Sequence, residues 1–282
     1  TARSRGLGDV YKRQSVKSLI MFDEILIFGA LGILSGLLAG MFGIGGGLIM
    51  VPVLIGTFIN LGFENEIIVQ LAIGTSISCI IFSGLSSANA HRKKNSIDFD
   101  SFKPVASGIV FGAFLGALFA VQIDGLILKI TIATFVLIVG IDILLNKDLL
   151  QNMFRLKPKS IFVGSGIGFL SSILGIGGGT FSVPYFKGTG LDLTSAIGTS
   201  AACGVPIAIF GTLGYVVAGI NQNMLPNLSF GYVYLPALLG VSLTSIFSAK
   251  YGADIAHYLS QATLRRLMAG WFFIISIYMF VV

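Results

Sequence analysis

The chain alternates between long apolar segments and short polar connections. The apolar segments cover residues 25–42, 48–59, 67–90, 102–121, 126–145, 160–174, 180–186, 195–220, 232–249 and 264–281. Most of them can cross a hydrocarbon core of roughly 30 Å as a helix. The segments that begin at Gly47 and Gly179 reach only about 21 Å and about 15 Å, at 1.5 Å per residue. The pattern predicts an all-α integral membrane protein with about eight full spans and two half-length segments.

Composition supports this class. Of 282 residues, 55% are hydrophobic and 11% are charged, whereas soluble domains carry about 25% charged residues. The mean hydropathy is +0.92. Because a water-soluble fold of this size could not bury so much apolar surface, we expect a lipid bilayer around the protein.

The net charge of +6 comes mainly from the start of the chain. Residues 1–20 hold Arg3, Arg5, Lys12, Arg13 and Lys17 against Asp9 alone, and the remainder has a net charge of +2. Since Met21 opens the first apolar run, we interpret residues 1–20 as a non-native or disordered extension. The basic charge therefore gives no reason to expect a nucleic-acid partner.

Cysteine and histidine are too sparse for a metal or disulfide framework. The two cysteines lie inside apolar runs, and His91 and His257 are far apart. We also find no nucleophile–base pair placed for catalysis. No metal, cofactor or enzymatic activity is expected.

Two motifs recur in the same order and indicate an internal duplication. Residues 43–52, which contain Gly-Ile-Gly-Gly-Gly and a Val-Pro pair, return as residues 175–184, at an offset of 132. The sequence Ala-Ile-Gly-Thr-Ser at 72–76 returns at 196–200, at an offset of 124. We predict two transmembrane repeats, residues 21–147 and 160–282, joined by a cytoplasmic linker at 148–159.

Loop charges predict that the repeats have opposite orientations. The segments 91–94, 147–159 and 250–266 are basic and should be cytoplasmic, whereas 122–125 and 221–227 have almost no basic charge. Equivalent loops of the two halves then face opposite sides. Two inverted repeats of five segments each satisfy this condition, and such repeats are common among secondary transporters. The expected location is the prokaryotic cell membrane, with multiple crossings.

Each glycine break should expose backbone N–H groups at the start of a half-length helix. Such N-termini bind anions, and glycine allows close approach. We predict a substrate site from both breaks and from the hydroxyls that follow: Gly45, Gly46, Gly47, Thr75, Ser76, Gly177, Gly178, Gly179, Thr199 and Ser200. Alternatively, the glycines form close-packed helix surfaces, and the hydroxyls bond to their own helices.

Three further residues are accessory candidates. Cys79 and Cys203 share the offset of 124 and could meet near the pseudo-axis, or they could simply fill apolar space. Asp142 is the most deeply embedded carboxylate, although it lies only four residues from Asn146 and could reach the interface.

The duplicated glycine and Gly-Thr-Ser motifs resemble those of the sulfite exporter TauE/SafE family. The resemblance covers about residues 21–282 and implies a membrane permease for sulfite, sulfonates or related organic anions. These motifs are specific for the family but do not distinguish its substrates.

The sequence therefore predicts an exporter of a small anion that works by alternating access. An inside-negative potential favours outward movement of each negative charge by about 2.3 kcal/mol per 100 mV. Import, transport of another small metabolite and a passive anion channel remain alternatives. Nothing in the sequence indicates the oligomeric state.

Overall fold

The computed structural model describes residues 26–38, 46–145 and 160–281. Gly45, the predicted extension 1–20 and the predicted linker 148–159 lie outside these ranges. Within the described ranges the regular elements are helices, as predicted: Leu26–Leu38, α2 (Gly47–Asn60), α3 (Ile68–Lys93), α4 (Phe99–Ala120), α5 (Gly125–Leu145), α7 (Ser160–Leu174), α8 (Gly179–Thr189), α9 (Leu193–Gly219), α10 (Leu235–Tyr258) and α11 (Gln261–Val281).

Four helices are long and apolar enough to cross a membrane, namely α3, α4, α5 and α9. Helices α2 and α8 have 14 and 11 residues and are half-length, as the sequence predicted. Helix α7 is also short, at 15 residues, and the apolar parts of α10 and α11 are Leu235–Ser248 and Arg266–Val281. The sequence predicted about eight full spans. Four of these spans are confirmed among the described residues.

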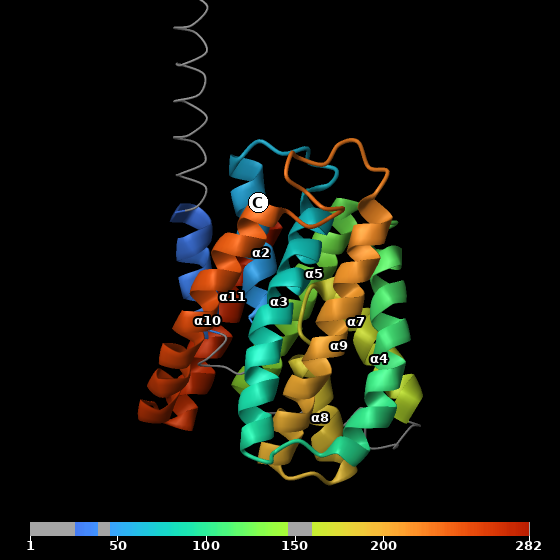
Figure 1. The fold of residues 1–282 in the computed structure, drawn as a ribbon. Coiled ribbons are helices and arrows are strands. Elements are labelled where there is room, and N and C mark those ends of the chain that lie inside the picture. Colours follow the sequence, from blue (N-terminus) through green and yellow to red (C-terminus); the bar gives the residue numbers. More distant parts are fainter. Residues whose placement is uncertain (1–25, 39–45, 146–159, 282) are drawn as a thin grey trace, which may run out of the picture.

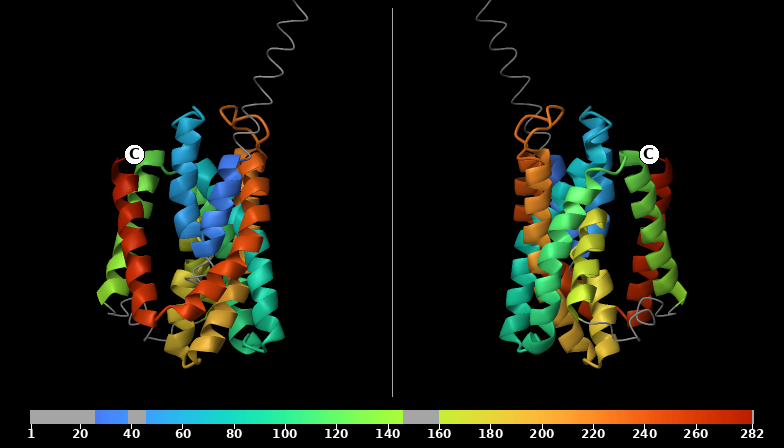
Figure 2. Two further views of the ribbon diagram at one scale, coloured as in Figure 1. Left: turned by 90° about the vertical axis from the view of Figure 1, so that its left-hand side faces the viewer. Right: turned by 90° about the vertical axis from the view of Figure 1, so that its right-hand side faces the viewer.

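The short helices form two hairpins that enter the bundle from opposite ends (Figures 1 and 2). Helix Leu26–Leu38 runs from the upper end toward mid-height, and α2 returns upward. Helix α7 runs from the lower end toward mid-height, and α8 returns downward. The starts of α2 and α8 therefore lie at mid-height. Inverted repeats would produce this arrangement. That the two halves are inverted repeats stays a prediction.

Glycine brings α4 and α7 into backbone contact. A Cβ atom added at Gly112 would overlap the carbonyl oxygen of Ser165, and one added at Gly164 would overlap that of Val105. Gly108 and Gly116 lie one turn to either side of Gly112 and face α7 in the same way. Small residues at this spacing are a common basis of helix association in membranes.

Helix Leu26–Leu38 packs on α10 in a similar way. A Cβ atom at Gly32 would lie 2.5 Å from the carbonyl oxygen of Val241, and one at Gly36 would lie 2.5 Å from that of Ser245. Gly32 and Gly36 precede Gly164 and Gly168 by the repeat offset of 132. The first helix of each half therefore uses equivalent glycines to contact the fourth helix of the other half.

The outer surface of the bundle is apolar. Phe111, Phe162 and Phe247 expose 67%, 70% and 72% of their surface. Exposure of many large apolar side chains is unfavourable in water but favourable against lipid tails.

We expect the substitution Gly112→Ala to destabilise the protein by about 1–3 kcal/mol, because α4 and α7 must separate to admit the new methyl group. The measurement is thermal unfolding of the purified protein in detergent. Gly166→Ala on α7 is the matched control, since nothing lies within 4 Å of a Cβ at that position. Equal melting temperatures for the two variants would contradict the packing argument.

Candidate functional site

The starts of α2 and α8 have the same local geometry. Their N-cap residues, Gly46 and Gly178, have φ angles of 67° and 77°, in the left-handed region that L side chains rarely adopt. The Gly46 carbonyl accepts the N–H of Met50 at 3.0 Å, and the Gly178 carbonyl accepts that of Ser182 at 2.9 Å. The duplicated glycine motif thus builds the same turn twice.

Each turn is followed by backbone donors that have no acceptor among the described residues. These donors are the N–H groups of Gly47, Leu48, Gly179 and Thr180. The first N–H groups of any helix lack an intrahelical acceptor and lie at the positive end of its dipole. These two sets of donors could bind a negatively charged group.

The two turns are in contact at mid-height. A Cβ atom added at Gly47 would overlap the carbonyl oxygen of Gly175 and lie 2.9 Å from the Cα of Ile176. Ser76, on α3, donates its hydroxyl to the Gly175 carbonyl at 3.1 Å. In the second half, the Ser200 hydroxyl lies 2.7 Å from that of Ser182 on α8. The structure thus brings Gly46, Gly47, Ser76 and Gly175 to one place, with Gly177, Gly178 and Gly179 continuing from it.

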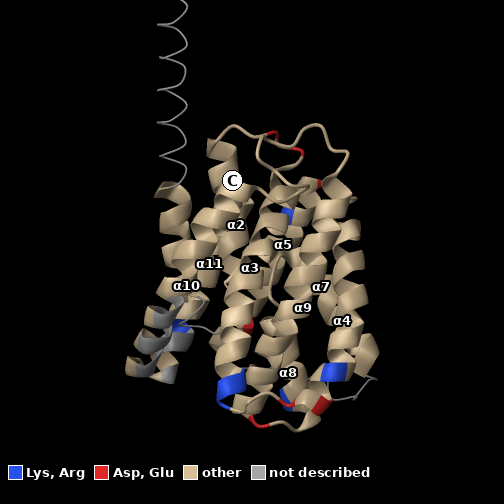
Figure 3. Ribbon diagram, viewed as in Figure 1, with Lys and Arg blue, Asp and Glu red and all other residues tan. Residues whose placement is uncertain are grey.

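Charged side chains are absent from four of the described helices around these turns. Helix Leu26–Leu38, α2, α7 and α9 contain no Lys, Arg, Asp or Glu, and the only charged residue of α8 is Lys187 in its last turn (Figure 3). Binding here would depend on neutral hydrogen-bond donors.

Thr75 takes part in a contact that we call the upper latch. Its hydroxyl oxygen accepts the backbone N–H of Tyr234 at 3.0 Å, and Tyr234 is the N-cap residue of α10. A Cβ atom at Gly74 would overlap the carbonyl oxygen of Tyr232. The Gly-Thr pair therefore clamps α3 to the backbone of the segment before α10, and this segment leads down from the loop at the upper end of Figure 1.

Thr199 forms the equivalent contact with the segment before α4, and we call this contact the lower latch. Its hydroxyl oxygen accepts the backbone N–H of Asp98 at 2.9 Å, and Asp98 is the N-cap residue of α4. A Cβ atom at Gly198 would overlap the carbonyl oxygen of Ser96. Both threonines are fully buried. In this structure their hydroxyl oxygens thus accept backbone N–H groups from the other half of the chain, a role that the sequence did not reveal.

The accessory candidates are spread over three helices. Cys79 on α3 and Cys203 on α9 are buried, and the Cys79 sulfur lies 4.0 Å from the carbonyl oxygen of Leu238. Asp142 is half-buried and lies in the last turn of α5. Ser171 and Thr180, which lie beside the second turn, were not predicted. Their signal in the sequence is that both carry hydroxyls in otherwise apolar segments.

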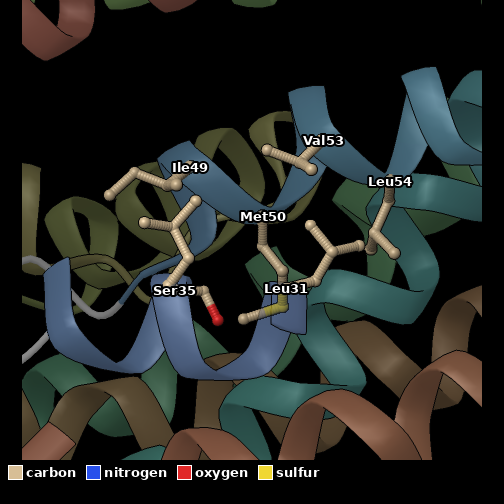
Figure 4. Close-up of a pocket in the computed structure, with 7 residues that line it drawn as sticks. Leu31, Ser35, Ile49, Met50, Val53 and Leu54 are labelled. Atoms are coloured by element: carbon tan, nitrogen blue, oxygen red, sulfur yellow. The ribbon is translucent and has the colours of Figure 1, made fainter. Parts of the chain in front are cut away.

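A separate hollow lies between helix Leu26–Leu38 and α2 (Figure 4). It has no room for a water molecule, and its lining residues are Leu31, Leu34, Ser35, Ile49, Met50, Val53 and Leu54. The one hydroxyl in this set, that of Ser35, donates to the Gly32 carbonyl at 3.2 Å. Its apolar lining makes this hollow unsuitable for an anion.

The substitution Thr75→Val should destabilise the protein by about 1–3 kcal/mol, because the buried N–H of Tyr234 would lose its acceptor. Thr75→Ser keeps the hydroxyl and should recover most of the loss. Thermal unfolding in detergent measures both effects. Equal decreases in melting temperature for Thr75→Val and Thr75→Ser would contradict the upper latch.

Similarity to known proteins covers almost the whole chain. The sequence profile of the sulfite exporter TauE/SafE family matches residues 28–279. A probable membrane transporter protein of Haemophilus influenzae is 35% identical over 262 residues, which are 92% of this chain and 99% of that protein. A probable membrane transporter protein of Methanocaldococcus jannaschii is 27% identical over 264 residues, or 92% and 97% of the two chains. No solved structure matches significantly. The chain belongs to the sulfite exporter TauE/SafE family of membrane transporters.

Proposed function

We propose that the protein exports a small anion, which binds where the half-length helices α2 and α8 begin. The observation that carries this proposal is the contact at mid-height between two matched glycine turns that reach it from opposite ends. Their unpaired N–H groups supply donors at the depth where a carrier holds its substrate. Sulfite or a related sulfonate is the proposed substrate class, in line with the family's name.

The two latches support transport by alternating access. The upper latch joins α3 to the segment before α10, and the lower latch joins α9 to the segment before α4. Each latch therefore connects one half of the chain to the other, the upper latch at the start of α10 and the lower latch at the start of α4. Opening one while the other stays closed would expose the central site to one side at a time.

Membrane potential is the proposed driving force. Outward movement of one negative charge is favoured by about 2.3 kcal/mol per 100 mV when the inside is negative. In proteoliposomes loaded with sulfite, we expect saturable efflux that accelerates when the interior is made negative. External sulfite should stimulate exchange, as in a carrier. Voltage-independent flux would refute electrogenic export, and non-saturable flux would indicate a channel.

Substitution at the second glycine turn should stop this efflux. In Gly178→Val the new side chain meets Ile207 and must adopt a φ of 77°, so the turn should distort and the N–H groups should move. Gly62→Val is the matched control, because Gly62 has a φ of 73° but nothing lies within 4 Å of a Cβ there. We expect at least a tenfold loss of efflux in the first variant, estimated as about 1.4 kcal/mol or more of lost binding energy. Normal efflux by a correctly inserted Gly178→Val protein would refute the site.

A further inference from the structure

We propose that the second hairpin provides most of the recognition of the anion, through the hydroxyls of Ser171 and Thr180 added to the N–H groups of Gly179 and Thr180. This inference rests on the proposed function and makes its site asymmetric. The binding residues would come from α7 and α8, whereas the turn before α2 would contribute backbone alone.

The hydroxyl of Ser171 is buried and lacks a partner. Ser171 is 0% exposed, and no hydrogen bond of its hydroxyl oxygen is found among the described residues. That oxygen lies 3.4 Å from the position that a Cβ on Gly178 would occupy. The Ser171 hydroxyl therefore lies at the N-cap of α8, next to the helix's unpaired N–H groups.

Thr180 adds a second hydroxyl at the same turn. It lies in the first turn of α8, is 8% exposed, and its hydroxyl oxygen also lacks a partner among the described residues. The hydroxyl of neighbouring Ser172 also lacks a partner among the described residues, but it lies 2.9 Å from the Cβ position of Gly211 and is directed at α9, so it is not part of the proposed site.

These unpaired hydroxyls contrast with other buried hydroxyls nearby. Ser76, Ser78 and Ser182 each donate to a backbone carbonyl at 2.7–3.1 Å. A buried hydroxyl without a partner destabilises the folded state. Two such groups beside one half-helix start are explained if a ligand with several acceptor atoms completes their hydrogen bonds.

The repeat itself provides an internal comparison. At the offset of 132, the positions of Ser171 and Thr180 correspond to Ala39 and Leu48 in the first half. The glycine turn is thus duplicated but its hydroxyls are not. A purely structural need of the turn would apply to both halves, so the hydroxyls of the second half indicate a function that the first half lacks.

The donors of this site are neutral, and that limits the charge of its ligand. Neither hairpin has a charged side chain near the turn in the described residues. The cost of dehydrating an ion grows with the square of its charge, while hydrogen bonds from neutral groups cannot neutralise a second charge. The expected ligand is a singly charged oxyanion.

Binding of sulfite to the purified full-length protein, measured by calorimetry, tests the hydroxyls. Ser171→Ala and Thr180→Val should each weaken binding about tenfold, as expected for a hydrogen bond to a charged group. Ser165→Ala and Thr131→Val are the matched controls, because these hydroxyls donate to carbonyls of their own helices at 3.1 Å and 2.8 Å. Both controls should bind as the wild type does.

The melting temperature of the anion-free protein provides a second readout. Removal of an unpaired buried hydroxyl should leave the melting temperature unchanged or raise it, whereas a merely structural hydroxyl would lower it. Wild-type affinity in both variants, or a lowered melting temperature together with weaker binding, would overturn the inference and leave the proposed function standing. Failure of the wild type to bind sulfite would overturn both.

Competition against sulfite tests the charge of the ligand. Methanesulfonate, which carries one charge, should displace sulfite at a lower concentration than sulfate, which carries two. The opposite ranking would overturn the preference for a single charge.

Discussion

Backbone hydrogen bonding in a medium without water is the constraint on which this structure depends. A helix that stops inside a membrane exposes N–H groups that lipid cannot satisfy, so the break must be enclosed by protein. Here two breaks are brought together at mid-height, and the backbone of one turn contacts that of the other. The hairpins, the latches and the packed helices around them form that enclosure.

Close approach of backbones makes the enclosure possible. Helices α4 and α7 meet through Gly108, Gly112 and Gly116, and helix Leu26–Leu38 meets α10 through Gly32 and Gly36. Close packing, one of the two roles considered for glycine, therefore occurs in this chain, whereas anion binding by the glycine turns stays a prediction. Some glycines allow helix contact, and Gly46, Gly175 and Gly178, which have positive φ angles, belong to the turns before α2 and α8.

Sequence reasoning was most successful where the backbone constraint is local. The start of α2 at Gly47 and that of α8 at Gly179 follow from consecutive glycines and a proline in the next turn. The partners of Thr75 and Thr199 could not be predicted, because each threonine binds a backbone N–H. The two partner segments, Tyr-Val-Tyr at 232–234 and Ser-Ile-Asp at 96–98, share no residue type and so leave no repeated signal.

The contact of the first described helix with α10 affects the order in which the chain can fold. The Ser248 hydroxyl donates to the Gly32 carbonyl across 216 positions of sequence. During synthesis, the glycine face of helix Leu26–Leu38 therefore enters the membrane long before α10 exists. Until the ribosome has made most of the second half, that face must be covered by lipid or by the insertion machinery, so the bundle can close only as translation ends.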